Sequence, residues 1–115
     1  IHPAAEVNVV ATAAILRDEA EVLDALVEAL IDGDAPNQRI PLERLREQPP
    51  ALRRLVVQRM ADGSVGRLAP GVARRADDVA ALSDTGTAML DLPSGVRAIA
   101  ERGVLRFVPH GHTAG

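Results

Sequence analysis

The chain has 115 residues and a net charge of −3, a length that suits one domain in which nearly all of the sequence packs together. It has no cysteine, which excludes a disulfide framework, a thiolate metal site and a cysteine nucleophile, and Phe107 is its only aromatic residue, which excludes a base-stacking surface. Charged residues interrupt every apolar run, so we expect neither a transmembrane span nor a signal peptide, no membrane partner and a cytoplasmic location.

The first predicted element is a long helix over residues 3–32. Apolar side chains recur at alternating steps of four and three residues, which is typical of one continuous stripe along a helix. The stripe consists of Val9, Ala13, Leu16, Ala20, Leu23, Val27 and Leu30. Pro3 suits a first helical turn and Gly33 suits the far end. We therefore expect this helix to be the spine of the domain.

Shorter elements follow the long helix. A polar loop over 33–39 precedes a short helix over 41–47, which the prolines at 49 and 50 end. A helix is then predicted from 50 or 51 to about 62, a loop over 64–70, and a last helix over 70–82. Apolar alternation around a Pro-Ser-Gly corner predicts three short strands, over 88–92, 96–101 and 104–108.

These elements predict a mainly α fold of the α+β class: a small helical domain around one long N-terminal helix, with a short C-terminal β-hairpin or meander. The domain is expected to cover residues 1–108, and residues 109–115 to form a flexible tail. Because the chain begins at Ile1 rather than at methionine, we also expect it to be a fragment of a longer protein.

Charge is distributed unevenly along the sequence. Residues 1–34 hold one arginine against eight acidic residues, residues 35–75 hold nine arginines against three, and the remainder holds three arginines against five. A mildly acidic chain can therefore present a local positive field, and arginine suits bidentate phosphate contacts. A GC-rich genome, which replaces lysine by arginine, explains the absence of lysine equally well.

Three stretches resemble one known family. The segments are HPAAEVN with LRDEA at 2–8 and 16–20, PPALRRLVVQRM at 49–60, and DLPSGVRAIAERGVLRF at 91–107. In that order they resemble the tRNA-binding domain of bacterial tRNA(Ile)-lysidine synthetases, which follows a PP-loop ATPase domain. Two positions depart from the family's pattern: Met60 stands where relatives often have tryptophan, and Ser94 stands where a Gly-Gly turn has its first glycine.

The resemblance implies a parent enzyme that ligates lysine to the wobble cytidine of tRNA(Ile), with ATP and magnesium as its cofactors. This chain would be the substrate-binding domain. Its partners would be tRNA and the catalytic PP-loop domain of the same parent chain. The family's S-G-G-x-D-S loop is absent from this sequence, as is any other phosphate-cradling loop, so the chain alone is expected to have no catalytic residue and to bind no cofactor or metal.

Arginines on exposed helix faces are the predicted RNA contacts, because cationic side chains bind the phosphate backbone. The set consists of Arg53, Arg54, Arg59, Arg74, Arg75 and Arg97. The resemblance places Arg53, Arg54 and Arg59 on the basic helix of the family. It places Arg97 at the strand turn, where it either contacts RNA or stabilises the hairpin. The alternative to RNA contact is that all six arginines are simply solvated on the surface.

Other interpretations remain open from the sequence. The leading one is a helical interaction or scaffold module that forms a homodimer through its long first helix. The spacing of His110 and His112 allows a metal site, although no third ligand accompanies them and an untethered tail explains them better. Acidic side chains at 18, 21, 24 and 28 are typical of a solvated helix face rather than of a catalytic cluster.

Overall fold

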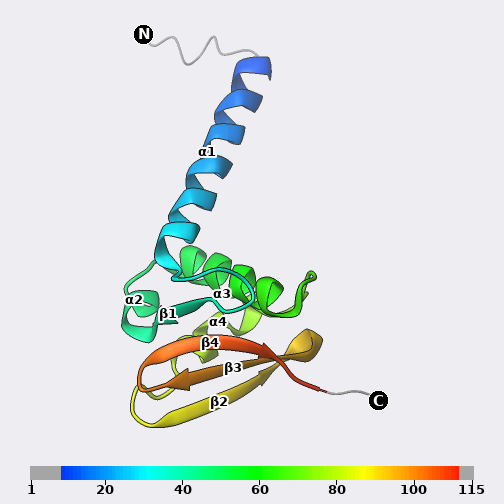
Figure 1. The fold of residues 1–115 in the computed structure, drawn as a ribbon. Coiled ribbons are helices and arrows are strands. Elements are labelled where there is room, and N and C mark those ends of the chain that lie inside the picture. The colour runs from blue at the N-terminus through cyan, green and yellow to red at the C-terminus, as the bar shows by residue number, and fades with distance from the viewer. Residues whose placement is uncertain (1–8, 112–115) are drawn as a thin grey trace.

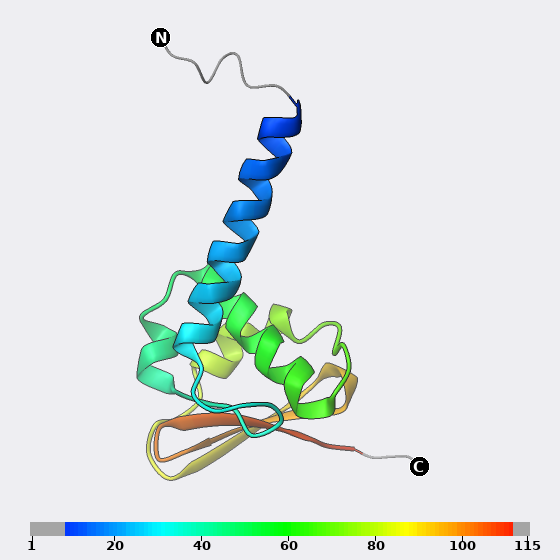
Figure 2. The ribbon, with the colours of Figure 1, turned by 45° about the horizontal axis from the view of Figure 1, so that its top comes forward.

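The computed structural model describes the backbone of residues 9–111 and the side chains of residues 17–111. Its elements in chain order are α1 (Val9–Leu30), β1 (Arg39–Pro41), α2 (Leu42–Arg46), α3 (Pro50–Val65), the 3-10 turn η2 (Ala73–Arg75), α4 (Ala76–Ala80), β2 (Thr87–Leu92), the 3-10 turn η3 (Pro93–Gly95), β3 (Val96–Glu101) and β4 (Val104–Pro109). The helices α3 and α4 lie on one side of the sheet, and α1 extends away from this body (Figures 1 and 2).

The four strands form one antiparallel sheet in the order β1-β4-β3-β2. β3 and β4 are joined by a two-residue turn at Arg102 and Gly103, where both φ angles are positive, at 52° and 82°. Positive φ at both central residues is the signature of the type I′ turn, whose twist matches that of the flanking strands. The turn fixes the register, in which Ala100 lies opposite Leu105 and Ala98 opposite Phe107.

The core lies between α3 and the inner face of the sheet. Val56, Val57 and Met60 on α3 are buried, as are Leu105 and Phe107 on β4. Small residues on β3, at positions 98 and 100, let the helix approach the sheet, and they are also buried. Because Phe107 is the only large ring available, aliphatic side chains fill the rest of this layer.

The prediction of a mainly α domain built around the first helix is wrong. Among the described side chains of α1 only Val27 is buried, while Leu23 is 42 % and Leu26 is 46 % exposed. The structure is an α+β fold whose centre is the α3–sheet layer, and the N-terminal part of α1 runs past the end of that layer (Figure 1). Helical periodicity specifies which residues share a face, but it does not specify that another element covers that face.

Residues 1–8, the start of the expected helix, and the side chains of Val9, Ala13 and Leu16 lie outside the described part of the chain. The single helix expected over 70–82 is instead the 3-10 turn η2 followed by the five-residue helix α4, while α2 and α3 lie close to their predicted bounds. α3 continues through Gly63 to Val65 and ends at Gly66, whose φ of 71° provides a left-handed cap. A side chain at Gly63 would lie 2.8 Å from the amide oxygen of Gln38, so this glycine permits close packing rather than ending the helix.

The three C-terminal strands are confirmed within one residue of their predicted bounds, whereas β1 was not predicted. Ile40, between the predicted loop and the predicted short helix, lies in this strand opposite Leu105 and is fully buried. Three residues are too few to display a two-residue alternation, so this strand has no periodic signal in the sequence. β1 exists because the edge of β4 offers it backbone partners, which is a tertiary contact.

Candidate nucleic-acid interface

Four of the six predicted RNA contacts form ion pairs within the domain, and Arg59 and Arg75 are two of them. Arg59 on α3 binds Asp24 and Glu28 of α1, with nitrogen–oxygen distances of 3.0 and 3.5 Å. Arg75 binds Asp78, three residues further along the chain, at 2.7 Å. Exposed ion pairs of this kind contribute about 0–1 kcal/mol, so they exchange readily, but the paired carboxylates cancel much of the local positive charge.

The side chain of Arg53 is held by contacts within the domain. Its Nη1 donates a hydrogen bond of 2.6 Å to the carbonyl of Gln48, and its Nη2 lies 3.5 Å from Asp77. Its side chain is 20 % exposed, and its Nε is buried without an acceptor among the described residues. These contacts join the residue before the two prolines and the start of α3 to α4, so Arg53 serves the packing of the helices.

Arg54 and Arg74 are exposed, and neither forms an ion pair or a side-chain hydrogen bond within residues 17–111. Gln58, one turn after Arg54, accepts a hydrogen bond of 3.1 Å from the backbone N–H of Ala73, directly before Arg74. The two arginines therefore flank one contact between α3 and η2. Five of the predicted contacts lie on the helices. Arg53, Arg59 and Arg75 are paired with carboxylates, so Arg54 and Arg74 are the two whose charge is not neutralised within residues 17–111.

A second basic surface lies on the sheet. The strand register places alternate residues on the side away from α3 and α4, a surface that we call the open sheet face; it comprises Thr87, Met89, Asp91, Arg97, Ile99, Glu101, Val104, Arg106, Val108 and Arg39. No helix covers this side in Figures 1 and 2. One face of an antiparallel sheet is commonly left to solvent in this way.

Two arginines stand directly opposite each other on the open sheet face. Arg39 of β1 pairs in register with Arg106 of β4, and like charges at directly opposed positions are destabilising. The nearest carboxylate on this face, that of Glu101, lies 3.8 Å from Arg106. Arg102, exposed in the β3–β4 turn, lines the same shallow hollow as these three residues. The arrangement offers three cations and one anion to a ligand.

Asp32, which also pairs with Arg39 through the backbone, does not neutralise the charge of the Arg39 side chain. Asp32 forms an isolated backbone bridge with Arg39, but its carboxylate is bound by Arg44 of α2 at 3.1 Å. Arg44 also donates to the carbonyl of Leu30 at the end of α1, where free carbonyls attract cations. The positive charge of Arg39 is therefore available at the sheet edge.

Arg97 lies at the other end of the open sheet face, within a three-residue cluster. Its Nε donates to Asp91 at 2.7 Å, and its Nη2 lies 2.9 Å from the Nε2 of His110. The hydrogen bond from Arg97 lowers the pKa of the Asp91 carboxyl below its usual value, and the same bond raises the pKa of Arg97. This geometry stabilises the hairpin, which was one of the two roles considered for Arg97.

Sequence reasoning did not include Arg39, Arg102 or Arg106 among the candidate contacts. The signal was present for Arg106, since it alternates with buried Leu105 and Phe107 and must face the opposite side. Arg39 could be placed only once β1 was known. His110, expected in an untethered tail, is joined to the sheet because its N–H donates to the carbonyl of Gly95 at 2.7 Å, whereas His112 lies outside the described residues.

Comparison with protein-family models and with curated proteins finds no match to this chain. Within residues 9–111, no helix is long and apolar enough to cross a membrane, and no three side chains of metal-ligating type come together. The fold and the site define an α+β domain whose antiparallel sheet leaves one arginine-bearing face open.

Proposed function

We propose that this chain is the tRNA-binding domain of an enzyme similar to tRNA(Ile)-lysidine synthetase. The catalytic PP-loop domain of the same parent chain would use ATP, with magnesium, to ligate lysine to the wobble cytidine of tRNA(Ile) in the cytoplasm. The present domain would hold the tRNA for that reaction. Holding a substrate within about 1 Å of its productive position can change a rate roughly 100-fold, so such a domain needs no catalytic group of its own.

The opposed arginines of the open sheet face are the observation that carries this proposal. Arg39 and Arg106 repel each other across the β1–β4 pair, with Arg102 beside them and a single carboxylate at 3.8 Å. A phosphate bound between them turns this repulsion into two charge-assisted contacts. The lack of tyrosine and tryptophan directs such binding to the backbone of structured RNA rather than to stacked single-stranded bases.

The test is the salt dependence of tRNA binding by three variants. Arg39→Gln with Arg106→Gln removes two cations from the open sheet face, and Arg54→Gln with Arg74→Gln removes the unpaired cations of the helical surface. Arg75→Gln is the control, because Asp78 already neutralises that residue. Fluorescence anisotropy with a labelled tRNA(Ile) transcript, between about 50 and 200 mM salt, gives the slope of log affinity against log salt.

Each lost phosphate contact reduces this slope by about 0.7–0.9, so the sheet variant should lower it by roughly 1.4–1.8 and the control should leave it unchanged. An equal slope for the sheet variant and the wild type would remove the open sheet face from the proposal. If neither double variant changes the slope, both arginine surfaces are excluded as contacts, and a wild-type chain that shows no saturable binding of the transcript refutes RNA binding itself. The slope of the variant with Arg54→Gln and Arg74→Gln decides whether these two arginines contact the tRNA together with the open sheet face.

A self-associating module is the second candidate, and one observation favours it. Val22, Leu23 and Leu26 on α1 are 58 %, 42 % and 46 % exposed, which is unusual for three neighbouring aliphatic residues. Asp18 and Glu19 line the same part of the helix, so a second copy would oppose like charges. Sedimentation of the wild type and of Leu23→Asp across a concentration range tests it: a dimer that the substitution abolishes would establish self-association.

A further inference from the structure

The two edges of the sheet differ in how many of their backbone groups are already bonded. On the outer side of β1, the N–H and the C=O of Arg39 are bonded to Asp32 at 2.9 and 2.8 Å, and Pro41 has no N–H to offer. At the opposite edge, β2 is six residues long and pairs only with β3 within residues 9–111 (Figure 1). The sheet thus protects its short edge and leaves its longer edge open to a further strand.

The register shows which backbone groups of β2 point away from β3. In an antiparallel pair, alternate residues exchange hydrogen bonds with the neighbouring strand. The N–H of Arg102 donates to the carbonyl of Gly86 at 2.8 Å, so the even-numbered residues of β2 are the ones that bind β3. Thr87, Met89 and Asp91 therefore direct their N–H and C=O groups outward. The free edge offers a donor and an acceptor at each of these residues.

The side chains of β2 do little to protect this edge. Proteins commonly block an exposed edge with a proline, a lysine or a bulge. β2 contains neither proline nor lysine, its ladder with β3 runs through all six residues without a bulge, and its one charged residue is Asp91. That carboxylate is paired with Arg97 at 2.7 Å, and the side chain of Met89 is 56 % exposed. The edge is thus apolar and nearly free of repulsive charge.

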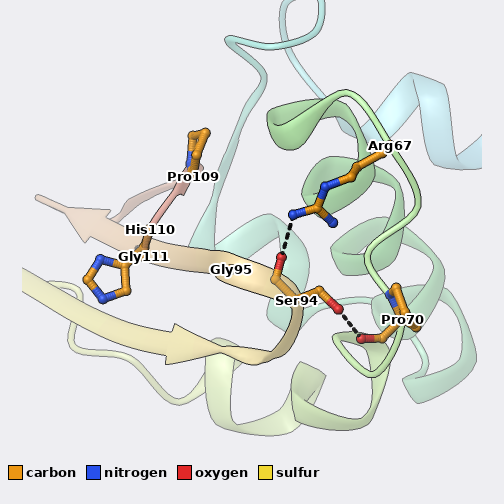
Figure 3. Close-up of a pocket in the computed structure, with 7 residues that line it drawn as sticks. All are labelled: Arg67, Pro70, Ser94, Gly95, Pro109, His110 and Gly111. Carbon is orange, nitrogen blue, oxygen red and sulfur yellow. Dashed lines mark hydrogen bonds between the residues drawn. The ribbon is translucent and has the colours of Figure 1, made fainter. Parts of the chain in front are cut away.

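Both ends of β2 are held by the fold. Beyond its last residue, the hydroxyl of Ser94 donates to the carbonyl of Pro70 at 2.7 Å, and the carbonyl of Ser94 accepts a hydrogen bond of 3.0 Å from Arg67 (Figure 3). Before its first residue, the carbonyl of Gly86 is bonded to Arg102. An added strand therefore meets a preformed template, which lowers the entropy cost of pairing.

We propose that this edge binds a second copy of the chain, with the two β2 strands antiparallel and Met89 opposite Met89. This register places all three outward-facing residues of both strands in hydrogen-bonded pairs. It sets each Thr87 opposite Asp91 of the other copy, so a hydroxyl donor faces a carboxylate and no like charges are directly opposed. On the helix side it sets Ala88 opposite Leu90, a small residue against a large one that is only partly buried.

A two-fold pair of this kind is closed. The two β2 edges cover each other, and the outer edges of the combined sheet are then the two β1 strands, whose outward groups are already bonded or missing. The dimer therefore leaves no open edge from which a filament could grow. It also joins the two open sheet faces into one surface, with Met89 and its cross-strand neighbour Ile99 of both copies at the centre.

The first measurement is backbone amide hydrogen exchange, followed by nuclear magnetic resonance. A pair of six-residue strands is a small interface, so the dimer should be reversible and concentrations from about 10 µM to about 1 mM are needed. The N–H groups of Thr87, Met89 and Asp91 should gain protection as the concentration rises, whereas those of Ala88 and Leu90 should be protected throughout. Sedimentation over the same range should show the mass rising from one chain to two.

Substitutions on the open sheet face test the register. Met89→Lys opposes two ammonium groups and should weaken the dimer several-fold, whereas Thr87→Lys sets an ammonium opposite Asp91 of the other copy and should strengthen it several-fold. Opposite effects of the same new side chain cannot arise from misfolding. Met89→Pro removes an outward N–H from each strand without removing a bond to β3, and should weaken the dimer about tenfold or more. Val104→Lys is the control, because β4 is paired on both sides.

A chain that stays monomeric at the highest concentration would overturn the proposal, as would a dimer in which the odd-numbered residues of β2 gain no protection. A dimer that Leu23→Asp abolishes and Met89→Lys leaves intact uses α1, and it would overturn the proposal too. The inference does not rest on RNA binding. The salt dependence of tRNA binding is measured separately on the arginine variants, so failure of the β2 dimer and failure of the RNA proposal are distinguishable.

Discussion

Arg53 and Arg54 are adjacent in the sequence and were predicted to act alike, yet the structure separates them. We expect Arg53→Ala to destabilise the domain by about 1–2 kcal/mol and Arg54→Ala to change its stability by no more than about 0.5 kcal/mol. The charge removed is the same in both variants. The difference therefore measures tertiary contacts rather than net charge.

The magnitude follows from the contacts of Arg53. Its hydrogen bond of 2.6 Å to the carbonyl of Gln48 belongs to a class worth about 1.5–3 kcal/mol, because the donor is charged. The 3.5 Å pair with Asp77 adds little, since that carboxylate is 83 % exposed. Removing the buried, unpartnered Nε relieves about 1 kcal/mol of desolvation. The balance is a loss of about 1–2 kcal/mol.

Far-ultraviolet circular dichroism is the suitable probe, because the chain has no tryptophan or tyrosine for fluorescence. Urea unfolding gives the free energy, and thermal unfolding should show a fall in Tm of at least about 4 °C for Arg53→Ala. Equal stability of the Arg53 and Arg54 variants would refute the structural role of Arg53. A charge reversal of both residues together would confound folding with RNA binding, so the single variants are needed.

Phe107→Ala should lower the free energy of unfolding by about 3–5 kcal/mol, because the ring is buried at the centre of the α3–sheet layer; urea unfolding measures it, and a loss below about 1 kcal/mol would contradict the assigned core. Ser94→Gly should be nearly neutral in Tm, since relief of the left-handed φ, worth about 1–2 kcal/mol, offsets the lost bond to Pro70; Ser94→Ala, which only loses the bond, should be the less stable variant. The pKa of Asp91 is lowered by Arg97, so its contribution to stability is present above the unfolded pKa of about 3.9 and is lost as pH falls through the lower folded value. Asp91→Asn should therefore show a shallower loss of urea midpoint between about pH 4 and pH 2, and an unchanged acid slope would exclude this linkage.

Local sequence chemistry was sufficient for α3 and for the three C-terminal strands. Prolines at 49 and 50 begin α3, and alternation between polar and buried residues, as in Leu105, Arg106 and Phe107, is visible along β4. The Pro-Ser-Gly corner also lies where the sequence predicted, because left-handed φ values are confined to a few residue types. These features depend on interactions within a few residues, which the sequence contains directly.

The uses of α1, β1 and the arginines depend on which groups meet in space. The stripe on α1 is regular, but only Val27 among its described side chains finds a buried place, since no other element runs alongside the rest. Arg53 and Arg54 differ only because the carbonyl of Gln48 and the carboxylate of Asp77 lie beside one of them. The sequence by itself determined where α3 and the three C-terminal strands form, through periodicity and turn chemistry. The tertiary structure alone decided which cations are neutralised and which face remains open, because both depend on contacts between residues far apart in the chain.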